Sequence, residues 1–222
     1  MSLRNLTDRL SKLGWREEAL AALQEAVRIR RQAAASCPGA YVADLARSLS
    51  ELATLLSEMG RWEEALEATQ EAVGIYRELA ASGPEAVLPD LANSLSELAT
   101  LLSEMGRWEE ALGAAGEAVR SCRQLAEACP DAYLPDLALS LRARSLCLRG
   151  LERSEEALAD LGEGIRILTP CFSNIPVAHI QLMGALLADY LALGKALRRE
   201  PDAPLLAPAL RAFARLRQQT PD

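Results

Sequence analysis

The chain holds few side chains suited to catalysis or metal binding. It has one histidine, His179, and five cysteines. A histidine metal cluster or a Ser-His-Asp site would depend on His179 alone. No two cysteines have the spacing of zinc ribbons or redox CxxC motifs, and no secretion signal points to an oxidising compartment, so we expect reduced thiols. We therefore expect no enzyme activity, no cofactor and no metal site.

Other patterns with a chemical interpretation have a simpler structural one. Gly162 and Gly164 resemble part of a phosphate loop, but they follow no predicted strand and lack a Lys-Ser/Thr pair. Trp15, Trp62 and Trp108 could stack on a ligand, although packing between helices is the preferred interpretation. Paired glutamates recur before Ala-Leu, which indicates first turns of helices, where carboxylates favour the helix dipole.

An internal repeat defines the elements that position these residues. Residues 48–66 and 94–112 are identical, lie 46 positions apart, and read SLSELATLLSEMGRWEEAL. A fixed period indicates stacked units rather than one globular core. We predict four repeats over residues 1–168, with a degenerate fifth repeat and capping helices over 169–222. The four repeats are 1–46, 47–92, 93–138, and 139–168 with its link.

Each repeat is predicted to be a helical hairpin, because its apolar residues follow two stripes of helical spacing. Gly60 marks the break inside the hairpin, and Pro84 marks the break between repeats. Pro89 and Pro135 are expected in the first turn of the helix that follows.

The repeats at the two ends are irregular. The first begins partway along its first helix, so we predict either excision from a longer array or a frayed cap. In the fourth, Arg144 replaces Leu98, Ser154 replaces Trp108, and the glycine moves to Gly150. Beyond it we expect helices from about 176 to 194 and from about 204 to 218.

Composition and charge narrow the class of protein. Half of the residues are hydrophobic but only 4% are aromatic, which is typical of closely packed helices. No apolar run approaches the ~18 residues of a membrane span, and the N-terminus lacks the apolar centre of a signal peptide. We expect a soluble cytoplasmic protein that does not bind membranes. The net charge of −7, concentrated in residues 47–138, argues against nucleic acid as a partner.

The repeat resembles the tetratricopeptide repeat. Leu49, Leu52 and Leu56, followed by Gly60 and the aromatic Trp62 before Ala-Leu, match the signature of that family. The 46-residue period is longer than the usual ~34, and is similar to the arrays of kinesin light chains and of bacterial multidomain signalling proteins. The resemblance implies an all-α fold, a right-handed superhelix of helical hairpins.

The resemblance also implies a binding groove lined by the first helix of each hairpin. Carried over residue by residue, the candidate binding residues are Arg47, Ser50, Thr54, Glu58, Asn93, Ser96, Thr100, Glu104 and Arg142. The same face adds Ser57 and Ser103 in the middle repeats, and Arg4, Asp8, Lys12, Leu146 and Arg149 in the outer ones. The alternative is that these residues form an ordinary solvated face.

The sequence thus predicts a non-catalytic protein-interaction scaffold. Short hydroxyl side chains could hydrogen-bond an extended chain, and the acidic centre of the groove favours a basic or neutral peptide or protein segment. The alternative function is oligomerisation, or a spacer or sensor segment of a larger signalling protein, with self-association through the repeat ends.

Overall fold

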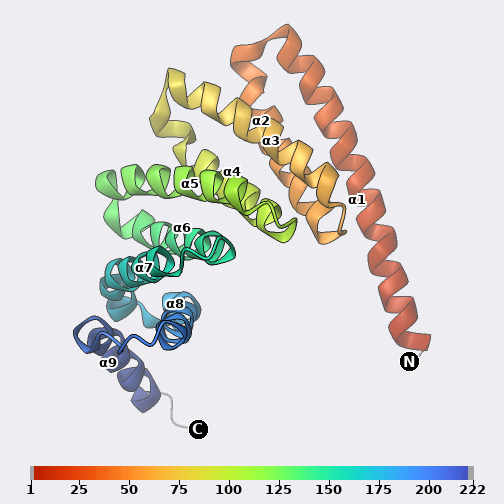
Figure 1. The fold of residues 1–222 in the computed structure, drawn as a ribbon. Helices are drawn as coiled ribbons and strands as arrows, with labels where there is room; N and C mark the ends of the chain where they lie inside the picture. Colours follow the sequence, from red (N-terminus) through yellow and green to blue (C-terminus); the bar gives the residue numbers. More distant parts are fainter. Residues whose placement is uncertain (1–2, 220–222) are drawn as a thin grey trace. The chain divides into compact units, whose positions relative to one another are not determined.

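The structure, a computed structural model, describes the backbone of residues 3–219 and the side chains of residues 15–83 and 86–216. Every regular element in this part of the chain is an α helix (Figure 1). The helices are α1 (Leu3–Ser36), α2 (Pro38–Glu58), α3 (Trp62–Ser82), α4 (Pro84–Glu104), α5 (Trp108–Ala128), α6 (Pro130–Gly150), α7 (Ser154–Asn174), α8 (Pro176–Ala196) and α9 (Ala203–Gln219). The predicted all-α fold of repeated hairpins is confirmed from α2 onward.

The helix boundaries follow the sequence period. The A helices, α2, α4, α6 and α8, each begin at a proline. Proline suits the first helical position because the N–H it lacks would have no partner there. The B helices α3, α5 and α7 carry two glutamates in the first turn, as predicted. The guanidinium of Arg61, just before α3, donates to Glu64 at 2.6 Å. The same pair recurs before α5 and α7.

The turn inside each hairpin has a left-handed residue at one fixed position. Its φ is 74° at Gly60 and 73° at Gly106, where glycine is favoured because it has no Cβ. The next two turns keep this conformation without glycine, with φ of 60° at Glu152 and 55° at Arg198. Gly150 therefore does not take over the role of the turn glycine. It ends α6 at a point where a Cβ would clash with the indole ring of Trp108.

The prediction that Pro89 and Pro135 lie in the first turn of a helix is wrong. Both lie inside helices, because α4 and α6 begin five residues earlier, at Pro84 and Pro130. A proline inside a helix removes one backbone hydrogen bond. In α6 the carbonyl that loses its partner is that of Asp131, an exposed first-turn residue whose carbonyl can bind water.

The first repeat is not a hairpin, which is a second correction. α1 runs without a break through Gly14, the position equivalent to Gly60. Trp15 stands there in place of Arg61, so the arginine–glutamate pair that opens α3 has no counterpart in α1.

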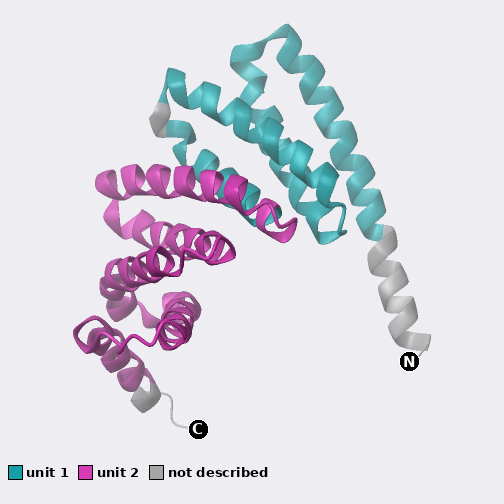
Figure 2. Cartoon of the chain, in the orientation of Figure 1, with its two compact units in different colours: residues 1–101 teal, residues 102–222 magenta. Residues whose placement is uncertain are grey.

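The chain divides into two compact units, residues 1–101 and 102–222 (Figure 2). In unit 1, α2 packs against α1 and α3 around the buried Tyr76. In unit 2, α6 packs against α5 and α7, and α7 packs against α8 and α9. The centre of this core is formed by fully buried α7 side chains, namely Leu161, Ile165, Leu168 and Phe172. α7 continues through the predicted repeat boundary between residues 168 and 169.

Helix α8 is the most apolar of the described helices. By length and composition alone it could cross a membrane, which differs from the expectation drawn from the sequence. It is the one described helix of which this is true. One such helix is weak evidence, since core helices pass the same test. Here α8 buries Met183, Leu186 and Leu187 in unit 2.

Candidate binding surface

Helix α2 carries four of the predicted binding residues. Arg47, Ser50, Thr54 and Glu58 are three or four residues apart, so they lie along one face of the helix. Arg47, Thr54 and Glu58 are exposed and Ser50 is half-buried. The opposite stripe of α2 packs into the core of unit 1. The structure therefore brings these four side chains together, as predicted.

Helix α4 carries the equivalent residues one repeat later. Asn93 and Thr100 are exposed, and Ser96 is half-buried. The Ser96 hydroxyl donates to the carbonyl of Ala92 at 2.9 Å, and the Thr100 hydroxyl donates to the carbonyl of Ser96 at 2.9 Å. Each hydroxyl keeps acceptor capacity for a ligand.

Side-chain hydrogen bonds join α2 to α4. The hydroxyls of Ser50 and Ser94 lie 3.1 Å apart, and the Thr54 hydroxyl donates to Oε1 of Glu97 at 2.9 Å. Two predicted binding residues thus also hold the A helices together. Glu97 was missed because the sequence does not show which positions face the neighbouring A helix. Burial raises the pKa of Glu97 above its ordinary value, more than the bond from Thr54 lowers it.

The charged residues of this surface in unit 1 make only long, exposed ion pairs. Arg16 on α1 lies 3.6 Å from the carboxylate of Glu58, and Arg47 lies 3.5 Å from Asp44. All four side chains are more than 40% exposed, so the contacts are screened by water and leave the charges available. The side chains of Arg4, Asp8 and Lys12 lie outside the described residues.

The two remaining predicted binding residues lie in unit 2 and differ in their contacts. Glu104, the last residue of α4, is exposed. Arg142 on α6 donates from Nε to Oδ2 of Asp189 on α8 at 2.7 Å, with the two side chains 30% and 22% exposed. Arg142 therefore joins two A helices, as Thr54 does in unit 1. Asp189, another missed residue, stands two repeats after Glu97.

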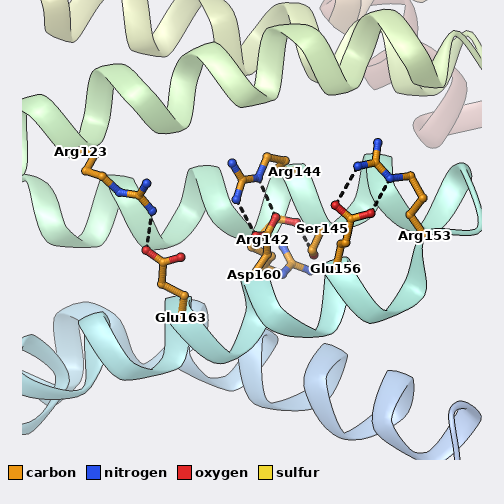
Figure 3. Close-up of polar contacts among 8 residues, drawn as sticks. All are labelled: Arg123, Arg142, Arg144, Ser145, Arg153, Glu156, Asp160 and Glu163. Carbon is orange, nitrogen blue, oxygen red and sulfur yellow. Dashed lines mark hydrogen bonds and ion pairs between the residues drawn. The ribbon is translucent and has the colours of Figure 1, made fainter.

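Unit 2 holds a second ion pair, of which only Arg144 was singled out from the sequence. Arg144 on α6 donates from Nε and Nη2 to both carboxylate oxygens of Asp160 on α7, at 2.7 and 2.6 Å (Figure 3). The side chains are only 25% and 9% exposed. The equivalent residues two repeats earlier are Leu52 and Ala68, both buried. The pair replaces an apolar contact between an A helix and a B helix, so it is a packing feature.

The residues with a chemical interpretation lie in packing positions or at the surface. All five cysteines are unpaired. Burial raises the pKa of Cys122 and of Cys147, which makes both thiols poor nucleophiles. The described residues hold no cluster of three metal-ligating side chains. Trp108 packs on α6, but Trp15 is 72% exposed and Trp62 39% exposed, so packing between helices is wrong for Trp15 and partial for Trp62.

Family comparisons agree with this arrangement of helices. Tetratricopeptide-repeat models match residues 1–34 and 44–124, together just over half of the 222 residues. The chain belongs to the tetratricopeptide-repeat family. The fold of this family is typical of protein–protein interaction scaffolds. No curated protein matches this sequence significantly.

Two solved tetratricopeptide-type structures are similar in fold. One is an array of nearly identical TPR-like repeats of kinesin light chain type from Podospora anserina, with 20% identity, a TM-score of 0.54, and coverage of 88% of this chain and 95% of that one. The other is BtubC from P. vanneervenii, with 18% identity, a TM-score of 0.52, and coverage of 90% and 82%. At these identities the likeness concerns the fold alone.

Proposed function

We propose that the protein is a non-catalytic interaction module that binds an extended, basic or neutral segment of a partner protein along the A helices of unit 1. The observation that carries this proposal is a row of exposed polar side chains that recurs one repeat apart, with Thr54 on α2 and Thr100 on α4. The family fold, typical of interaction scaffolds, supports this class of function.

The chemistry of this row suits an extended chain. The Ser96 and Thr100 hydroxyls can accept from a peptide backbone N–H, since their own protons are donated within α4, and the amide of Asn93 can both donate and accept. Glu58 supplies a carboxylate that would pair with a cationic side chain, because its contact with Arg16 is long and exposed. Such charge complementarity mainly sets selectivity and association rate.

A random decapeptide display library, selected on the intact protein, tests the proposal. We expect one class of selected peptides to be basic or neutral, and to lose about tenfold in affinity with Glu58→Lys, since a like charge replaces an opposite one. Fluorescence anisotropy with labelled peptides measures the affinity. Arg120→Glu, an exposed change on α5, controls for altered surface charge. Affinities unchanged by Glu58→Lys would place the site elsewhere.

Self-association is a second candidate function. It is favoured by three apolar side chains of α8, Val177, Ile180 and Leu191, which are 79%, 39% and 43% exposed. Exposed apolar patches tend to mark interaction sites. Sedimentation equilibrium tests it: Val177→Asp should convert an oligomer to a monomer. A wild-type protein that stays monomeric at high concentration would lack this function.

We also propose that the protein acts in the cytoplasm and needs no cofactor, membrane or nucleic acid. The acidic charge of residues 47–138 supports the exclusion of nucleic acid, because phosphate contacts require basic side chains. Fluorescence imaging of the tagged protein in its own cells tests the location, and a membrane-bound signal would contradict it.

A further inference from the structure

The A helices of unit 2 present a different surface from those of unit 1. Leu139 on α6 stands at the position of Asn93, and Leu146 at the position of Thr100. Both leucines are exposed, at 50% and 40%. They are seven residues apart, so they lie on the same face of α6. The polar row of unit 1 thus has an apolar counterpart in unit 2.

Helix α8 extends this apolar surface. Ala185 and Ala192 stand one repeat after Leu139 and Leu146, and Ala192 is exposed while Ala185 is half-buried. The hydrogen bond from Arg142 to Asp189 holds α6 beside α8. Because the two helices have the same boundaries relative to the period, equivalent residues lie on equivalent faces. The leucines and alanines therefore form an apolar strip across two helices, which the Arg142–Asp189 ion pair interrupts at its centre.

The charge at the end of these A helices is also opposite to that in unit 1, where Glu58 supplies a carboxylate. Where the second repeat has Ser57, α6 has Arg149 and α8 has Lys195. Both cations are exposed, and neither makes an ion pair with another described residue. The position of Glu58 holds Gly150 in α6 and alanine in α8, so neither helix has a carboxylate at that position. Two unpaired cations therefore stand beside the apolar strip.

We propose that the A helices of unit 2 bind a partner segment that carries two apolar side chains followed by a carboxylate. This inference rests on the proposed function, that the A helices bind partner segments, and assigns unit 2 a ligand of opposite charge. Leu139 and Leu146 are about 10 Å apart along the helix, at ~1.5 Å per residue. In an extended chain of the polyproline II type, with three residues per turn and ~3.1 Å per residue, side chains three positions apart lie on one face and span a similar distance.

Such a segment would place its apolar side chains on the leucines and its carboxylate near Arg149 and Lys195. Burial of exposed apolar surface supplies most of the affinity. The cations of Arg149 and Lys195 select the acidic end by charge complementarity. A basic segment would meet repulsion at the same place, which separates the ligand of unit 2 from that of unit 1.

The same decapeptide display library tests the inference with the intact protein. We expect a second class of selected peptides that combine two apolar residues, three positions apart, with Asp or Glu after them. Leu146→Ser should weaken their binding about tenfold, as expected for one lost leucine contact. Arg149→Glu should weaken it by a similar factor and remove most of its salt dependence. Fluorescence anisotropy measures both.

Controls separate the two binding proposals. Glu58→Lys should leave the apolar–acidic peptides unaffected while it weakens the basic or neutral class. Arg120→Glu should affect neither class. The inference is overturned if no apolar–acidic class is selected, if that class is insensitive to both unit 2 variants, or if sedimentation shows that Leu146→Ser acts by dissociating a dimer. Loss of the basic or neutral class alone would instead count against the proposed function of unit 1.

Discussion

At the scale of single residues, Glu97 should make stability depend on pH. Burial between α2 and α4 raises its pKa. A raised pKa means that the folded state binds the proton more readily than the unfolded chain, so stability is greatest below the ordinary value of 4.5 and decreases as pH rises toward the raised value. We predict that Glu97→Gln raises the melting temperature at pH 7 and changes it little near pH 4.

Thermal unfolding followed by circular dichroism at the two pH values measures this difference. Glu51→Gln is the matched control, because Glu51 is the equivalent residue one repeat earlier and is exposed. It should leave the melting temperature nearly unchanged at both pH values. A Glu97→Gln protein that is less stable at pH 7 than the wild type would mean that the hydrogen bond from Thr54 outweighs the cost of burial.

The Arg144–Asp160 pair gives a second prediction at this scale. Asp160→Ala should destabilise the protein by about 3 kcal/mol, because it leaves a largely buried guanidinium without its partner. The double variant Arg144→Leu with Asp160→Ala restores the residue types found at Leu52 and Ala68, and should recover most of that loss. Urea unfolding measures both. A double variant no more stable than Asp160→Ala alone would contradict the prediction.

This pair also shows what single residues reveal in a sequence. Arg144 is visible as a departure from the leucine of the other repeats, and Asp160 equally departs from alanine. What joins them is a contact between an A helix and a B helix that only the structure gives. Thr54 with Glu97, and Arg142 with Asp189, show the same limit, since both pairs cross between A helices.

At the scale of elements, the hairpin turns predict a stabilising substitution. Glu152 has a φ of 60°, where Gly60 and Gly106 stand in the earlier turns. A side chain in the left-handed region costs about 1 kcal/mol, so Glu152→Gly should stabilise the protein by up to that amount. Gly60→Ala should destabilise it by a similar amount. Chemical denaturation measures both, and equal effects of glycine and alanine at residue 152 would rule out backbone strain as the cause.

The elements were predicted well where local chemistry decides them. The recurrent prolines and the paired glutamates mark the starts of the A and B helices, because both residue types suit a first turn for reasons internal to the helix. The failures are α1 and the starts of α4 and α6. Whether a helix tolerates Gly14 or Pro89 depends on neighbouring turns and packing, which a local pattern does not contain.

At the scale of the whole molecule, the identity of residues 48–66 and 94–112 was enough to predict stacked hairpins, because one unit cannot bury its apolar face alone. The candidate surface was predicted in part. The period places Thr54 and Thr100 on equivalent faces, but it does not tell which polar residues face solvent and which bridge helices. The exposed leucines of α6 replace polar residues at the same positions. Only their exposure in the structure marks them as a candidate binding surface.

The division into units predicts how the chain responds to a core defect. Phe172 on α7 is fully buried, and the centroid of its ring lies 4.7 Å from that of the Phe213 ring on α9. Phe172→Ala should cost about 4 kcal/mol of local stability. In a repeat array each unit is stabilised mainly by its neighbours, so the loss should remain near the defect. Hydrogen exchange read by mass spectrometry should become faster in α7, α8 and α9 and change much less in α2 and α3.

The matched substitution Tyr76→Ala, in the core of unit 1, should reverse that distribution. Uniformly faster exchange in both variants would mean that the chain unfolds as one cooperative body and that the two units are not independent in stability.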